Sequence, residues 1–136
     1  MALVLDTGVL FAAIDADDPA HDVCEDLLLA STEQLVIPAA VLVELDYWVR
    51  KTSTADAWLT FCEDVEAGEY IVYPLDAALL IAAARLEQRY NDLPLGLVDA
   101  SVIATCETLG ERKVATLDRR HFGVVRLDGK ALEIVP

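Results

Sequence analysis

Four acidic residues of this chain stand where a carboxylate is physically awkward: Asp6, Glu44, Asp99 and Asp118. Asp6 and Asp118 each end a short apolar run, Glu44 interrupts an apolar helical pattern, and Asp99 opens an apolar helical segment. Desolvating a carboxylate is expensive unless a partner neutralises it. If these four side chains converge they repel one another, and a divalent cation is their natural partner.

The donor type indicates the metal and the chemistry. Carboxylate oxygens without histidine or cysteine suit Mg²⁺, with Mn²⁺ as the expected substitute. Such an ion can activate a water molecule for attack at phosphorus and stabilise the leaving oxygen. The four acids therefore point to a metal-dependent enzyme acting on phosphate esters.

The elements that must position these acids follow from the hydrophobic pattern. Strands are predicted over residues 2–5, 35–37, 71–73, 114–115 and 132–135. Helices are predicted over residues 19–30, 38–50, 54–68, 76–90 and 98–109, the last stopped by Gly110. Short apolar strands that alternate with helices predict an α/β fold, with a parallel sheet covered by helices on both faces.

In such sheets, ligands bind at the carboxyl ends of the strands. Asp6 and Asp118 follow the first and fourth predicted strands directly, and Asp99 lies near a helix N-terminus. The helix dipole favours an anion there by roughly 0.3–1 kcal/mol. Taken singly, Asp6, Asp99 and Asp118 also suit the role of a cap, and Glu44 could pair with an arginine. Because all four are predicted at one sheet edge, the combination favours a site.

Composition sets further bounds. A chain of 136 residues predicts one domain over residues 1–136, and an apolar fraction of 55% excludes intrinsic disorder. The apolar content also suggests surface covered by a second copy, a homodimer. The net charge of −14 is unusual for a nucleic-acid-binding protein. The acids, including the stretch Asp15 to Asp18, either keep the protein solvated or partly meet a basic partner.

Cysteine use and hydropathy predict the compartment. The 3 cysteines are an odd count without metal-ligand spacing, which disfavours a disulfide framework and favours a reducing environment. No apolar run approaches the roughly 20 residues that span a bilayer. We expect a cytoplasmic protein without a membrane contact.

Four segments carry a resemblance to a known family. In order they read LVLDTGVL, PAAVLVELDYWV, LPLGLVDASVIATCETLG and VATLDRRHF. They resemble the successive motifs of PIN-domain ribonucleases, and the layout is most similar to VapC-type toxins of toxin–antitoxin pairs. The resemblance covers essentially the whole chain. It implies a PIN-like three-layer α/β/α sandwich with a central, mostly parallel sheet.

The resemblance also implies residue roles. In that family the acids matching Asp6, Glu44, Asp99 and Asp118 form the metal-binding catalytic cluster, and the residues matching Thr7 and Thr116 support it. It implies Mg²⁺-dependent endonucleolytic cleavage of RNA, often transfer or ribosomal RNA. It further implies homodimerisation, and inhibition by a cognate antitoxin whose C-terminal segment covers the site.

Three residues follow the last acid where some relatives carry a further acid: Arg119, Arg120 and His121. Guanidinium groups bind phosphate well, so we expect Arg119 and Arg120 to contact the RNA backbone. His121 could be a general acid or a phosphate contact, but we favour a residue that closes a surface turn. Trp48 is expected in the core or at a dimer contact.

Two other classes compete with the nuclease. A phosphatase-like or receiver-like Asp phosphotransfer domain would want a second acid two residues after Asp6, where Gly8 stands, and a well-placed lysine. A catalytically silent PIN-like binding module is disfavoured because all four acids are present.

Overall fold

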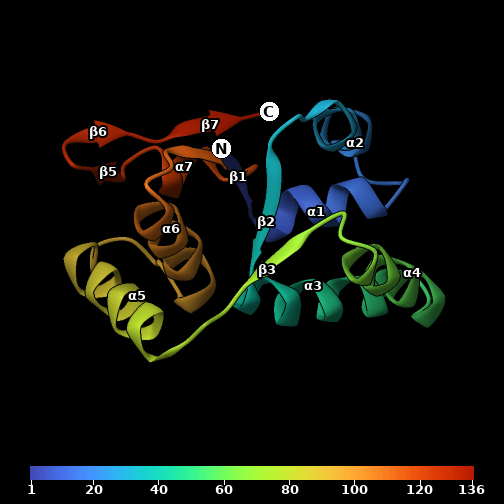
Figure 1. Ribbon diagram of the computed structural model, residues 1–136, viewed down its shortest axis with the longest axis horizontal. Helices are drawn as coiled ribbons and strands as arrows, with labels where there is room; N and C mark the ends of the chain where they lie inside the picture. Colours follow the sequence, from blue (N-terminus) through green and yellow to red (C-terminus); the bar gives the residue numbers. More distant parts are fainter.

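A five-stranded sheet divides the molecule into three layers in the computed structural model, which describes residues 1–136 (Figure 1). The sheet strands are β1 (Ala2–Leu5), β2 (Gln34–Pro38), β3 (Ile71–Tyr73), β4 (Lys113–Ala115) and β7 (Glu133–Val135). The helices are α1 (Thr7–Ile14), α2 (His21–Ala30), α3 (Ala39–Thr52), α4 (Ala55–Glu66), α5 (Ala77–Arg89), α6 (Leu97–Leu109) and α7 (Arg119–Phe122). A separate antiparallel pair joins β5 (Arg126–Leu127) to β6 (Lys130–Ala131).

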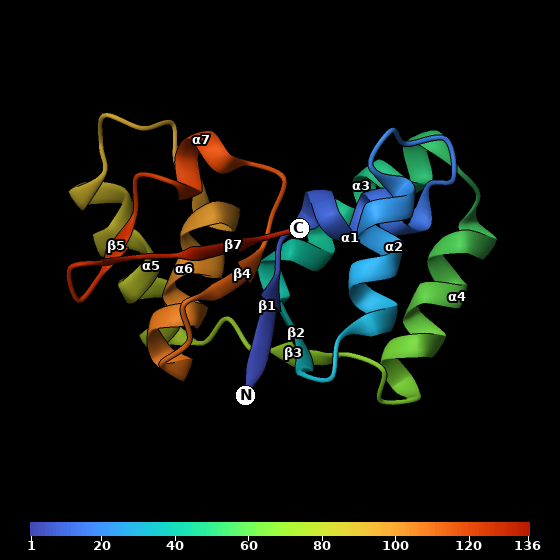
Figure 2. The ribbon, with the colours of Figure 1, turned by 90° about the horizontal axis from the view of Figure 1, so that it is seen from above.

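The strand order is β3-β2-β1-β4-β7, and every pair in this sheet is parallel. The chain builds outward from β1 to β3, then crosses to the other side of β1 to form β4. Figure 2 shows α1, α2 and α4 on one side of the sheet and α5 and α6 on the other. The strand order thus reverses between β1 and β4, which places a crevice at their carboxyl ends.

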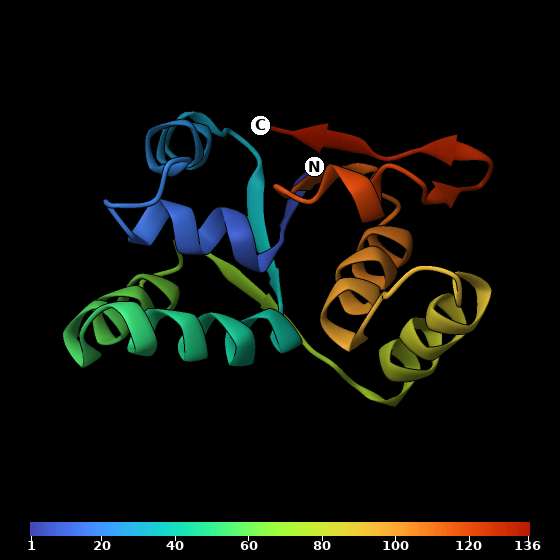
Figure 3. The ribbon, with the colours of Figure 1, turned by 180° about the vertical axis from the view of Figure 1, so that it is seen from behind.

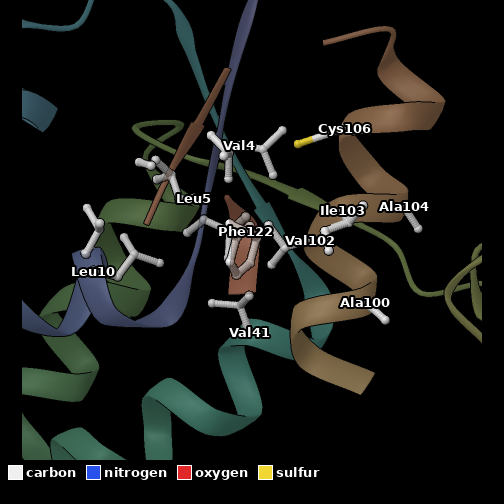
Figure 4. Close-up of a cluster of buried hydrophobic side chains, with 14 of the residues drawn as sticks. Val4, Leu5, Leu10, Val41, Ala100, Val102, Ile103, Ala104, Cys106 and Phe122 are labelled. Carbon is white, nitrogen blue, oxygen red and sulfur yellow. The ribbon is translucent and has the colours of Figure 1, made fainter. Parts of the chain in front are cut away.

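The core fixes the elements that border this crevice. All four residues of β1 are buried, as expected for a central strand with helices on both faces. Phe122 of α7 is fully buried, and it lies among Val4, Val41 and Val102 in Figure 4. Burying a phenylalanine side chain contributes about 1.5–3 kcal/mol. This anchor holds the short helix α7 over the edge of the sheet.

The strands and most helices match the sequence-based expectations, and the differences have local causes. Helix α1 was not predicted, because TGVLFAAI is apolar around its whole circumference and shows no helical period. The helix expected from residue 19 begins at His21, and Pro38 is the N-cap of α3 instead of its first residue. Each helix is too short or too polar to span a lipid bilayer.

Candidate metal centre

The four acids occupy four different elements that meet at the crevice. Asp6 follows β1 and caps α1, while Asp118 caps α7 shortly after β4. Asp99 lies in the first turn of α6, and Glu44 lies near the middle of α3. In Figure 3 the first turns of α1, α3 and α6 lie close together at the centre of the molecule.

Asp6 is held by three residues around the end of β1 and β4. Its main-chain nitrogen donates to the carbonyl oxygen of Ala115 over 2.9 Å. Its Oδ1 accepts the main-chain N–H of Thr7 over 2.8 Å, and its Oδ2 accepts the Thr116 hydroxyl over 2.7 Å. Thr116 Oγ1 also accepts the main-chain N–H of Asp118 over 3.0 Å. The Thr116 hydroxyl therefore connects the two strand-end acids.

His121 holds Asp118 from two directions. The main-chain nitrogen of His121 donates to Oδ1 of Asp118 over 3.0 Å, and its ring Nδ1 lies 2.6 Å from Oδ2. Burial acts to raise the pKa of Asp118, but the hydrogen bonds from His121 outweigh it and hold the pKa below its ordinary value. Asp118 is therefore a fixed, ionised carboxylate.

Asp99, unlike Asp118, has a raised pKa. It is half-buried, and no protein group donates a hydrogen bond to its carboxylate. Desolvation, followed by the charges of Asp6, Asp118 and Glu44, raises the pKa of Asp99 to about 6. The pKa of Asp6 is also raised, first by its burial and further by the charge of Glu44. These mutual effects place the four predicted acids in one electrostatic cluster.

The residues of this cluster fit a divalent cation. Ligand atoms of Asp99, Asp118 and His121 lie within 4.8 Å of one another. The hydroxyl oxygen of Thr7, directly after Asp6, is buried and has no hydrogen-bond partner. Carboxylates with raised pKa values gain most from a nearby positive charge, and their oxygens are hard donors. Asp99 and Asp118 would hold the ion within this group of ligand atoms, whereas Asp6 and Glu44 are linked to it through their charges.

His121 makes a contact that the sequence pattern does not predict. It does close a turn, as expected, but its ring also joins the acid cluster through Asp118. The available signal was the spacing of Asp118 and His121, which puts both residues on one turn of a helix. A helix of only four residues gives too little periodicity to predict that face.

The predicted RNA contacts are exposed, and one of them already has a partner. Arg119 and Arg120 both lie on the surface next to Asp118. The guanidinium group of Arg119 donates to the carbonyl oxygen of Pro136. Trp48 is not a core residue, because 42% of its surface is exposed.

These features define the class of protein. The PIN domain family model matches residues 3–127, and the chain belongs to the PIN-domain family. Within that family, it is 31% identical over 135 residues to Ribonuclease VapC26 of Mycobacterium tuberculosis, covering 98% of this chain and 100% of that relative. The VapC-type membership predicted from the four motifs is confirmed, and the phosphatase-like and receiver-like alternatives are set aside.

Solved structures confirm the predicted fold. The crystal structure of Mycobacterium tuberculosis VapC20, a sarcin–ricin-loop-cleaving toxin, has a TM-score of 0.85 at 18% identity, covering 98% of this chain and 99% of that chain. A toxin–antitoxin complex from Klebsiella pneumoniae has a TM-score of 0.74 at 16% identity, covering 98% and 96%. The DNA-bound VapBC of Salmonella typhimurium has a TM-score of 0.70 at 22% identity, covering 98% of each chain.

Proposed function

We propose that this chain, over residues 1–136, is a metal-dependent endoribonuclease and the toxin component of a type II toxin–antitoxin system. The observation that carries the proposal is the electrostatic cluster of four carboxylates at the switch point between β1 and β4. The 31% identity to a protein named a ribonuclease supports the same reaction. The expected ion is Mg²⁺, with Mn²⁺ as a substitute.

The contacts of each residue indicate its role in the reaction. Asp6, Glu44, Asp99 and Asp118 bind the cation and face the scissile phosphate. When bound, the ion activates water for in-line attack at phosphorus and stabilises the leaving oxygen. Thr7 and Thr116 orient the carboxylate of Asp6 through the two hydrogen bonds that it accepts.

Arg119 and Arg120 supply positive charge beside the acids, on a chain whose net charge is −14. We infer that they bind RNA phosphates on either side of the cut, in a transfer or ribosomal RNA. Attack by water yields a 5′-phosphate and a 3′-hydroxyl. A 2′,3′-cyclic phosphate product would instead indicate attack by the RNA's own hydroxyl group.

Two protein partners belong to the proposal. The Klebsiella pneumoniae structure is a toxin–antitoxin complex, and the Salmonella typhimurium structure is VapBC bound to DNA. These assemblies support a cognate antitoxin for this chain. A homodimer is supported by apolar side chains exposed on α3 and α5, among them Val43 at 76%, Leu80 at 48% and Ile81 at 50%. Contiguous exposed apolar surface often marks an interface with another chain.

The test is cleavage of total cellular RNA by the purified chain, freed of any bound partner. Reactions with Mg²⁺, Mn²⁺ or EDTA are compared, with Asp99→Asn in parallel. Discrete products that require metal and are absent with the variant are expected. Equal cleavage by Asp99→Asn, with an unchanged circular dichroism spectrum, would refute the site.

A further inference from the structure

One nitrogen donor lies inside the carboxylate cluster, and the proposed function leaves it without a role. The ring Nδ1 of His121 is 2.6 Å from Oδ2 of Asp118, and the ring joins Asp99 and Asp118 in a group of ligand atoms within 4.8 Å. Its side chain is only 19% exposed. Imidazole nitrogen is a softer ligand than carboxylate oxygen, and it favours transition-metal ions over Mg²⁺.

We propose that His121 is a direct ligand of the metal, which makes this centre a mixed oxygen–nitrogen site that prefers Mn²⁺ and later transition-metal ions to Mg²⁺. This inference rests on the proposed function, since it assumes that the carboxylate cluster binds a divalent ion. It adds a ligand, and it makes Mn²⁺ the preferred ion in place of the Mg²⁺ that the four carboxylates alone predict.

Packing of α7 against the core fixes the position of the His121 ring. Phe122, the next residue, is fully buried, so α7 cannot move without exposing it. The main-chain N–H of His121 is itself bound to Asp118, which sets the distance between the two residues. The cation would bind Nδ1 in place of the proton of this hydrogen bond, and that proton would leave to solvent or move to Nε2.

The other histidine provides a matched control. The chain has 2 histidines, and the ring Nδ1 of His21 is bound to the carbonyl oxygen of Ala12 over 2.8 Å. Its Nε2 lies 3.4 Å from Glu25. The charges that act on His21 come from Glu25, Asp22 and Asp15, none of which belongs to the carboxylate cluster.

The experiment is pulsed electron paramagnetic resonance of Mn²⁺ bound to the purified full chain labelled with ¹⁵N-histidine. A directly coordinated nitrogen is expected in the wild type and in His21→Gln, and it should be lost in His121→Gln. Calorimetric titration should show Mn²⁺ affinity reduced by at least about tenfold in His121→Gln. The reduction in Mg²⁺ affinity should be smaller.

A second variant separates loss of a ligand from loss of the fold. His121→Asp replaces the nitrogen donor with an oxygen donor, so the protein should still bind metal while the nitrogen signal disappears and the preference shifts toward Mg²⁺. Tight Mn²⁺ binding to the wild type without nitrogen coupling would overturn this inference alone. A wild type that binds neither Mn²⁺ nor Mg²⁺ would overturn the proposed metal centre, and this inference with it.

Discussion

Asp99→Asn should stabilise the metal-free protein, although it removes a side chain of the active site. Ionised Asp99 stands half-buried beside three other acids, and its pKa rises from 3.8 to about 6. A shift of that size corresponds to about 3 kcal/mol of unfavourable interaction at neutral pH, at 1.36 kcal/mol per unit. Solvent screening of a half-buried group, with the lost helix-dipole interaction, reduces this to about 1–2 kcal/mol.

The stability difference between Asp99→Asn and the wild type should depend on pH. Since the folded state holds the Asp99 proton more tightly than the unfolded state, wild-type stability falls as the pH rises from about 4 through about 6. In the variant an uncharged amide replaces this carboxylate, so the stability of the variant does not fall with pH for this reason. The advantage of Asp99→Asn over the wild type should therefore be small near pH 4 and reach its full value above pH 6.

Thermal unfolding followed by circular dichroism in EDTA measures this effect. At pH 7.5 the midpoint of Asp99→Asn should lie about 3–6 °C above that of the wild type. Asp56→Asn is the matched control, because Asp56 is an exposed acid in the first turn of α4 and its loss should lower stability slightly. Saturating Mn²⁺ should reverse the order, since only the wild type gains binding energy. A variant less stable than the wild type in EDTA would refute the account of repulsion.

Three further predictions test the supports of the site. Thr116→Val removes the hydroxyl that donates to Asp6, so it should lower the free energy of unfolding in urea by about 1.5–3 kcal/mol and weaken Mn²⁺ binding. Thr116→Ser keeps a hydroxyl and should retain wild-type stability and Mn²⁺ affinity. Equal behaviour of the two variants would contradict the role of the hydroxyl. Phe122→Ala should lower the free energy of unfolding by about 3–5 kcal/mol, and a loss below about 1 kcal/mol would show that α7 is not anchored by the core. Arg120→Ala should raise KM for RNA and leave calorimetric Mn²⁺ binding unchanged, so an unchanged KM would remove Arg120 from the RNA surface.

The positions of the strand-end acids can be predicted from the sequence, because they depend on the local hydrophobic pattern. Asp6 and Asp118 follow apolar runs that become neighbouring strands, and Glu44 of α3 acts on Asp6 and Asp99 through its charge. The adjacency of β1 and β4 is what joins them. That adjacency follows from the general rule for α/β sheets, not from any single residue.

The remaining features depend on contacts between distant residues or on very short elements. The hydrogen bond from Thr116 to Asp6 spans 110 residues of sequence, so no local pattern predicts it. Helix α1 cannot be predicted from periodicity because both of its faces are apolar. Helix α7 has only four residues, which is too short to show a period. The contact of the His121 ring with Asp118 depends on that short helix, whose position is set by the buried Phe122.

The proposed metal centre joins four carboxylates from different elements. Anomalous diffraction from crystals of the full chain soaked in Mn²⁺ tests it most directly. We predict one strong anomalous peak among the carboxylates of Asp6, Glu44, Asp99 and Asp118, absent from crystals of Asp99→Asn. A strong peak elsewhere on the molecule, with none among these carboxylates, would contradict the account.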